Sequence, residues 1–399
     1  MRNRTRTLWT LALAAACIPL AFVMWNRRSA RRPAPVVRFA TFNAALNRSE
    51  PGALRAELAS GECEQARKIA EIVQRCRVDV LLVCELDRDD AAESARLLAE
   101  RYFAVSQDSC EPIRYPFRYV GPSNTGVPSG LDLDLDGKIE GPGDCFGFGR
   151  FEGQYGMALF SRYPILEDRI RTFAGLRWSA MPGALRPDGY GDECWSAMRL
   201  SSKSHWDVPI GIGTVEEGLV VHALCSHPTP PVFDGPEDRN GRRNHDEIRF
   251  WIDYLSPPES GWIVDDLGRT GGLPAGEPFV ILGDLNCDPV DGDSRHDAIV
   301  SLLEHPRVRD PMPRSSGAVA SGRLLWPANH LHEGDSELDT FCDEQGKGPG
   351  NLRLDYVLPS ANLAVTARGV FWPAPEDPLG ALVTASDHRL VWVEFEVGR

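Results

Sequence analysis

Seven short apolar segments with the composition of β-strands are the feature that most constrains the fold of this 399-residue chain. They lie at residues 36–42, 78–83, 155–160, 218–225, 278–282, 354–358 and 390–397. Helical spacing of apolar residues appears between them, at residues 64–77, 91–102, 244–255 and 297–304. Since both short loops and helices connect the strands, we predict an α/β protein built as a layered sandwich. Its composition excludes disorder, collagen and coiled coil as the main state.

Polar residues that can bind a metal or carry a proton stand at the ends of these segments. They are Asn43, Glu85, His227, Asp284, Asn286, Asp355, Asp387 and His388. Strand ends of a layered sheet converge on one rim, which would bring the carboxylates, amides and two imidazoles together. Carboxylate and amide oxygens bind hard divalent cations, and imidazoles transfer protons. We therefore predict a metal-dependent site at this rim.

Each of these residues also has an ordinary structural explanation when it is taken alone. Asp284 follows a glycine, and such an aspartate is usually a turn residue. Asn43 could cap a turn, Glu85 could be a solvated charge at a strand end, and His227 could begin a loop. Six strand-end signals in succession, each with a suitable side chain, favour the catalytic interpretation.

The segments around these residues resemble the endonuclease/exonuclease/phosphatase superfamily, the group of pancreatic deoxyribonuclease, abasic-site endonucleases, sphingomyelinases and inositol-phosphate phosphatases. The matching segments are TFN at 41–43, Glu85, YGMALFSRYPI at 155–165, SHP at 226–228, GDLNCDP at 283–289, LRLDYVL at 352–358 and SDHR at 386–389. The resemblance covers about residues 36–395. It implies a four-layer α/β/β/α sandwich of two mixed β-sheets flanked by helices, and a catalytic domain at residues 33–399.

The resemblance implies that Glu85 binds Mg²⁺ or Mn²⁺, with Asn43 beside it and Asp387 completing the metal side of the site. A hard cation of this kind neutralises charge on phosphate oxygens and activates water. The expected cofactor is therefore a divalent cation held by oxygen ligands.

The resemblance also assigns roles to the other strand-end residues. His388 would contact the scissile phosphate or serve as general base, oriented by Asp355. Asp284 would handle the attacking water or protonate the leaving oxygen, and Asn286 would position it. His227 would stabilise phosphate oxygens or act as the acid partner. In-line attack on phosphorus needs charge neutralisation, a base and a proton donor, so the set implies metal-assisted hydrolysis of a phosphoester.

Three long segments rich in glycine and proline, at about residues 106–153, 172–213 and 228–243, are predicted to be surface insertions. The first contains Asp132, Asp134 and Asp136 followed by a glycine, which matches the first half of an EF-hand-type loop. The twelfth position, where such a loop has a glutamate, is Gly143. Two interpretations are open, a structural Ca²⁺ site separate from the catalytic centre and a solvated acidic turn.

The third insertion ends in Arg242 and Arg243. These guanidinium groups could contact a substrate phosphate, or they could form a surface ion-pair network with Asp246. Three tryptophans of the second insertion could line a cleft, but core packing is the preferred interpretation. They are Trp178, Trp195 and Trp206.

Residues 1–32 have the pattern of a signal peptide or an N-terminal membrane anchor. An apolar run of 18 residues from Leu8 to Trp25 lies between arginines on both sides. We therefore expect the catalytic domain outside the cytoplasm, either secreted, periplasmic or anchored to a membrane. Nine cysteines follow this segment; Cys84, Cys225 and Cys287 are expected to be buried, and the other six could form disulfides.

The charge of the chain bears on its substrate. The formal net charge is −14, and removing the seven arginines before Pro33 leaves 36 basic against 57 acidic residues, or −21. Such a body repels polyphosphate backbones, which favours a small-molecule or lipid-linked phosphoester over long nucleic acid. Two alternatives are a secreted nuclease acting on DNA or RNA, and a catalytically inactive, calcium-stabilised binding protein. The sequence leaves the oligomeric state open.

Overall fold

The computed structural model describes residues 36–397, except for residues 90, 214–217, 325–327 and 344–347. The predicted signal peptide or anchor at residues 1–32 lies outside this part of the chain. Across the residues that are described, no helix combines the length and apolar character that crossing a membrane requires.

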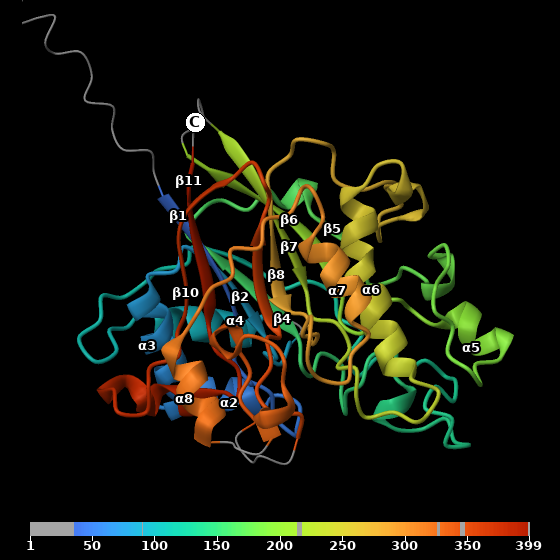
Figure 1. The fold of residues 1–399 in the computed structure, drawn as a ribbon, viewed down its shortest axis with the longest axis horizontal. Coiled ribbons are helices and arrows are strands. Elements are labelled where there is room, and N and C mark those ends of the chain that lie inside the picture. Colours follow the sequence, from blue (N-terminus) through green and yellow to red (C-terminus); the bar gives the residue numbers. More distant parts are fainter. Residues whose placement is uncertain (1–35, 90, 214–217, 325–327, 344–347, 398–399) are drawn as a thin grey trace, which may run out of the picture.

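Two mixed β-sheets stand at the centre of the molecule (Figure 1). The first contains β1 (Val36–Asn43), β2 (Val80–Cys84), β3 (Phe117–Tyr119), β4 (Met157–Ser161), β10 (Ala364–Val370) and β11 (Val391–Glu396). The second contains β5 (Arg171–Thr172), β6 (His205–Ile212), β7 (Leu219–Ser226), β8 (Phe279–Asp284) and β9 (Asp355–Pro359). The strand orders are β10-β11-β1-β2-β4-β3 and β5-β6-β7-β8-β9. Only β1 with β2 and β7 with β8 pair in parallel among these neighbours of the described chain.

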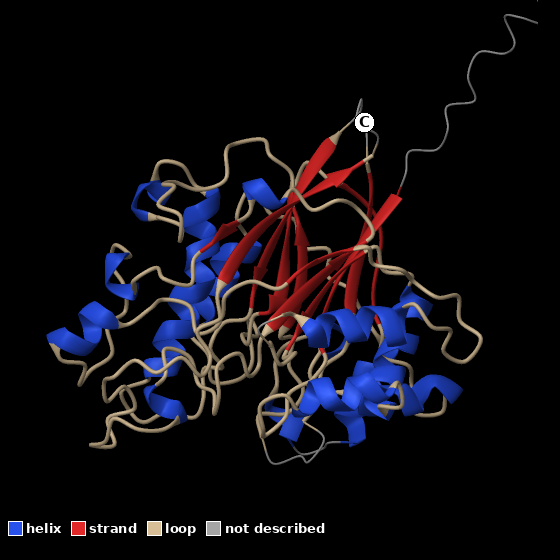
Figure 2. Ribbon diagram, turned by 180° about the vertical axis from the view of Figure 1, so that it is seen from behind, coloured by secondary structure: helices blue, strands red, loops and turns tan. Residues whose placement is uncertain are grey.

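Alternating side chains divide the protein into four layers. In β1, Phe39 packs between the two sheets, while Phe42 packs against helices. In β8, Leu282 likewise packs between the sheets, and Ile281 packs against helices. The helices α2 (Ala53–Ser60), α3 (Glu64–Cys76) and α4 (Glu93–Leu98) cover the first sheet, whereas α6 (Arg239–Leu255) and α7 (His296–Leu303) cover the second (Figure 2). The predicted α/β/β/α sandwich is confirmed. The two remaining α-helices, α5 (Asp192–Ala197) and α8 (Ser316–Leu324), lie in the connections.

All seven predicted strand segments are strands, but the predicted insertions were too long. β3 lies inside the first, α6 begins inside the third, and the second contains β6. The sequence of β6, HWDVPIGI, alternates apolar Trp, Val and Ile residues as a strand does, but it was placed inside a segment rich in glycine and proline. β5 pairs only with Trp206 and Asp207, and further along this edge the Pro209 carbonyl accepts the Leu166 N–H at 2.9 Å. The alternation of apolar residues therefore describes β6 better than its proline and glycine do.

The cysteines and tryptophans mainly fill the interior. No disulfide joins the cysteines of the described residues, and Cys84, Cys225 and Cys287 are buried as predicted. Trp206 packs between the sheets. Trp178 packs against Trp195 with ring centroids 5.3 Å apart. Core packing is therefore the main use of these rings.

Candidate active site

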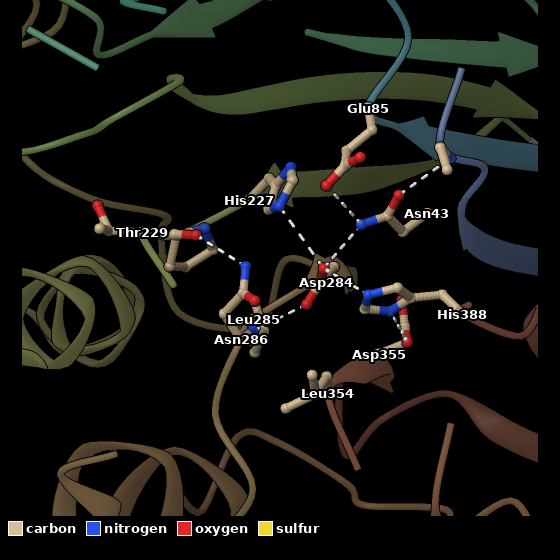
Figure 3. Close-up of polar contacts among 12 residues, drawn as sticks. Asn43, Glu85, His227, Thr229, Asp284, Leu285, Asn286, Leu354, Asp355 and His388 are labelled. Atoms are coloured by element: carbon tan, nitrogen blue, oxygen red, sulfur yellow. Dashed lines mark hydrogen bonds and ion pairs between the residues drawn. The ribbon is translucent and has the colours of Figure 1, made fainter. Parts of the chain in front are cut away.

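The predicted strand-end residues meet at one edge of the two sheets (Figure 3). Asn43 ends β1, Glu85 follows β2, and Asp284 ends β8. Because β8 and β9 are antiparallel, the first residue of β9, Asp355, pairs directly with Asp284. The face-to-face packing of the sheets thus joins residues that are far apart in the sequence.

The Asn43 amide bridges two carboxylates. Its Nδ2 donates to Asp284 Oδ2 at 2.9 Å and to Glu85 Oε1 at 3.2 Å. Its Oδ1 accepts the Ala45 N–H at 3.2 Å, which fixes the orientation of the amide. Asn43 therefore positions Glu85 and Asp284 relative to each other.

His388 and Asp355 form a buried pair on the other side of Asp284. His388 Nδ1 lies 2.8 Å from Asp355 Oδ2, and His388 Nε2 lies 3.6 Å from Asp284 Oδ2. Burial alone would lower the pKa of His388, but Asp355 and Asp284 outweigh it and raise that pKa to about 10. His388 is therefore a charged imidazolium at neutral pH, which favours contact with phosphate over service as a base.

His227 has the opposite electrostatic character. It follows β7, and its Nε2 lies 3.5 Å from Asp284 Oδ2. Burial, and then the positive charges of Lys203 and His388, lower its pKa well below the usual value. Asp284 thus lies between a neutral and a charged imidazole (Figure 3). Its own pKa is raised by burial to about 6, so it is mostly ionised at neutral pH.

The structure places the last two predicted residues differently. Asn286 Nδ2 donates to the Pro228 carbonyl at 3.1 Å, and its backbone N–H donates to Asp284 Oδ1 at 2.9 Å. Asn286 therefore connects the Asp284 turn to the loop after His227. The Asp387 side chain is exposed, and the hydrogen bonds described for it do not reach Glu85 or Asn43. A metal-binding role for Asp387 stays a prediction.

Three residues of the site were not identified from the sequence. Asn47 donates to Glu85 Oε2 at 2.8 Å, and Thr340 donates to Asp355 Oδ2 at 2.8 Å. Lys203 is buried, and burial lowers its pKa, while the charges of Glu247, Glu85 and Asp284 act against this change. Each lies in a loop whose local sequence has no catalytic pattern, so only the fold reveals them.

Arg242 and Arg243 both donate to loop carbonyls, and Arg242 forms an ion pair with Asp188 rather than with Asp246. A phosphate contact by either guanidinium group stays a prediction. Arg243 is buried and donates to the carbonyls of Leu200, Phe146 and Arg199 at 2.6–3.0 Å. Arg242 donates to the Arg186 carbonyl and to Asp188. Asp246 accepts hydrogen bonds from the Trp178 indole and the Leu185 N–H. The guanidinium groups therefore hold the insertions together, because loop carbonyls there have few other donors.

The residues present fit a divalent cation on the Glu85 side of the site. Burial raises the pKa of both Glu85 and Asp284, and a neutral amide is the group that bridges them. Oxygen donors of this kind suit Mg²⁺ or Mn²⁺. Asp284, Asp355 and His388 also lie within ligand distance of one another. Glu85, whose carboxylate is positioned by Asn43 and Asn47, is the residue that would hold the cation.

Two carboxylates suited to a cation, beside an aspartate–histidine pair at the rim of a four-layer sandwich, define a metal-dependent hydrolase of phosphoester bonds. A sequence model of the Endonuclease/Exonuclease/phosphatase family matches residues 40–388, and the chain belongs to this family. The matched range includes every residue of the site described above.

Solved structures support the fold. An endonuclease/exonuclease/phosphatase from Beutenbergia cavernae DSM 12333 is 17% identical, with a TM-score of 0.50 over 92% of this chain and 72% of that chain. Sphingomyelinase C from Streptomyces griseocarneus is 16% identical, with a TM-score of 0.45 over 90% and 99% of the two chains. A mannosyl-6-phosphatase from Bacteroides thetaiotaomicron VPI-5482 is 14% identical, with a TM-score of 0.43 over 90% and 100%. None of the curated protein sequences matches the chain. At 17% identity, the first of these structures supports the fold of this chain and nothing about its substrate.

Proposed function

We propose that this protein is an exported enzyme that hydrolyses a phosphomonoester or phosphodiester of a small molecule or a lipid. The observation that carries the proposal is a cavity of about 680 Å³ that adjoins Glu85 and His227. Its volume is that of a typical small-ligand pocket. Apolar side chains from the insertions supply much of its remaining wall, among them Leu133, Phe148, Trp178, Tyr190, Met198 and Phe233.

The charges around the phosphate position suggest how the residues divide the work. The His388 imidazolium, held by Asp355, would stabilise negative charge on phosphate oxygens. Asp284, whose pKa is raised by burial to about 6, would accept the proton of the attacking water. Lys203 lines the cavity next to Glu85 and His227 and would add a second positive charge. A divalent cation, when bound, supplies charge neutralisation and water activation.

Two sequence features support the choice of substrate and location. The net charge of −21 after residue 32 disfavours a long polyphosphate chain, and the apolar walls suit the organic group of a small or lipid-linked ester. Residues 1–32 support export. Fractionation of cells that produce the full chain would test the location, and recovery in the cytosol would contradict it.

The proposed activity can be tested on a panel of phosphoesters with Mg²⁺ or Mn²⁺. We expect the purified protein to hydrolyse p-nitrophenyl phosphate, bis-p-nitrophenyl phosphate or a phospholipid in micelles, with little nicking of plasmid DNA. Nicking without turnover of small or lipid esters would identify a nuclease instead. Inactivity on every substrate with both metals would favour the inactive binding protein.

Two exposed aromatic side chains at the cavity give a prediction about specificity. Phe148 and Phe233 line the cavity and are 60% and 86% exposed. Burial of one such ring by substrate contributes roughly 1.5–3 kcal/mol. We therefore expect Phe233→Ala to raise KM for an apolar or lipid ester about 10-fold or more on the same basis. The kcat for p-nitrophenyl phosphate should be unchanged.

Leu267→Ala is the matched control, because Leu267 is also an exposed apolar residue, at 79%, and does not line the cavity. It should leave both kinetic constants as they are in the wild type. If KM rises equally in Leu267→Ala and Phe233→Ala, the effect does not depend on the cavity. If KM rises in neither Phe148→Ala nor Phe233→Ala, the substrate does not bind in the cavity.

A further inference from the structure

The acidic loop of the first insertion places three carboxylates together. Asp132, Asp134 and Asp136 each offer an oxygen atom within 4.8 Å of the others. The backbone N–H of Gly137 donates to Asp132 Oδ2 at 2.9 Å, which closes the turn. Three carboxylates in a turn are common on solvated surfaces, and by themselves they do not identify a site.

A fourth carboxylate, Asp144, supplies an independent observation. Asp144 is 4% exposed, and its Oδ1 accepts the Leu133 N–H at 2.8 Å, directly beside the acidic loop. Among the described residues, none donates a hydrogen bond to its buried Oδ2. A buried carboxylate oxygen without a donor is costly unless a cation or another donor satisfies it.

Asp144 lies beside the same loop, where its carboxylate accepts the Leu133 N–H between Asp132 and Asp134. The Asp134 carboxylate lies against the backbone of Gly143, since a Cβ atom added there would meet Asp134 Oδ2 at 1.9 Å. The charges of Asp134 and Asp144 are also close enough to repel each other. The short 3₁₀ turn Pro142–Asp144 thus brings Asp144 next to the acidic loop, one residue after the position of the last ligand in an EF-hand-type loop. Its oxygen atoms are not within 4.8 Å of all three other carboxylates, so a bound cation would have to draw Asp144 closer.

We propose that Asp132, Asp134, Asp136 and Asp144 form a Ca²⁺ site. Ca²⁺ takes six to eight oxygen ligands in flexible geometry, so an aspartate can replace the usual glutamate. Backbone carbonyls and water would complete the coordination. Mg²⁺ demands near-ideal octahedral geometry and is the poorer occupant.

The site would connect calcium to the shape of the catalytic cavity. Leu133, Asp134 and Gly143 all line that cavity. The Tyr190 hydroxyl donates to the Leu133 carbonyl at 2.9 Å, and Arg239 donates to the Asp134 carbonyl at 3.2 Å. A cation on the loop would therefore fix one wall of the cavity. The site stands apart from the proposed activity, because cation binding needs no substrate.

Calorimetric titration of the purified protein with Ca²⁺, with Mg²⁺ in excess to fill the catalytic site, tests the proposal. We expect one calcium ion per chain with Kd roughly between 10⁻⁵ and 10⁻³ M, as in weaker EF-hand-type sites. Asp144→Asn and Asp134→Asn should each weaken binding at least about 10-fold, because each removes a charged ligand. Ca²⁺ should also raise the Tm of the wild type but not of these variants.

Two variants separate this site from other carboxylates. Asp168→Asn changes an exposed aspartate outside the loop and should bind Ca²⁺ like the wild type. Glu85→Gln, at the proposed catalytic metal site, should also retain it. Absence of calcium binding, or binding unchanged in Asp134→Asn, would overturn the site. Loss in Asp134→Asn with none in Asp144→Asn would overturn the role of Asp144.

Discussion

His388→Gln should lower kcat by about 10²–10³-fold, since removing one positioned group that stabilises transition-state charge costs roughly that much. The imidazolium lies 2.8 Å from Asp355 and 3.6 Å from Asp284, and it is the charged histidine of the site. Glutamine can donate a hydrogen bond but carries no charge, so charge stabilisation on the phosphate is lost. Steady-state hydrolysis of p-nitrophenyl phosphate or its diester measures the effect.

The matched control is His222→Gln. His222 also forms a buried pair with an aspartate, Nδ1 to Asp207 Oδ1 at 2.6 Å, but it lies in the middle of β7, outside the rim. This variant should lose stability while kcat of the folded protein stays near the wild-type value. If His388→Gln keeps more than about a tenth of wild-type kcat, the loss is too small for a group that stabilises transition-state charge, and His388 is not catalytic.

The same histidine predicts a pH dependence of stability for the metal-free protein. His388 has an ordinary pKa of 6.5, and the folded site raises it to about 10. Its ion pairs therefore stabilise the fold fully below about pH 6.5, and this contribution declines as the pH rises to about 10. Asp284, with a pKa raised to about 6, titrates below this range. Urea unfolding measures the free energy of unfolding of the wild type and of His388→Gln. The difference between the two should shrink from pH 7 to pH 10. A difference that stays constant would contradict a positive charge on His388.

Glu85→Gln should raise the Mg²⁺ or Mn²⁺ concentration needed for activity by about 10²-fold or more. Even changes to groups that only orient a ligand cost roughly 10–100-fold in metal affinity. Glu85 is held by Asn43 and Asn47, so its carboxylate is preoriented for a cation. Activity measured against metal concentration, with calorimetry of metal binding, gives the result. Excess metal should restore part of the lost activity.

Asp87→Asn is the control for this variant. Asp87 is a buried carboxylate two residues further along the same loop, where it accepts the N–H groups of Arg48 and Tyr155. Its replacement should lower stability without changing the metal concentration at half-maximal activity. An unchanged metal requirement in Glu85→Gln, with full activity, would place the cation elsewhere in the site.

The strand segments and their polar ends were predictable because both are local properties. Each strand is short and apolar, and its position in the sequence does not depend on its partner. The gathering of Asn43, Glu85, Asp284 and Asp355 at one edge then follows from strand direction. What the sequence did not contain was the register that sets Asp284 opposite Asp355, or the packing that brings His388 to both.

The insertions were less predictable, because their contacts are long-range. β6 was placed in an insertion because the surrounding segment is rich in glycine and proline, yet it alternates apolar residues and pairs with β7 along its whole length. Arg243 was considered as a phosphate ligand, and the structure shows that it donates to three loop carbonyls. Asp144 is one residue out of register for an EF-hand-type loop, and a short turn places its carboxylate beside that loop. In each case a partner distant in sequence determines the role.

The sequence by itself determined the fold class, the family resemblance and the types of side chain at the strand ends. These features depend only on the local order of residues. The tertiary structure decided which charges face one another and therefore their protonation. It makes His388 cationic and His227 neutral, although both are histidines at strand ends. It also built the cavity from three separate insertions. The physical reason is that pKa values and cavity shape depend on burial and on neighbours, which only the folded chain brings together.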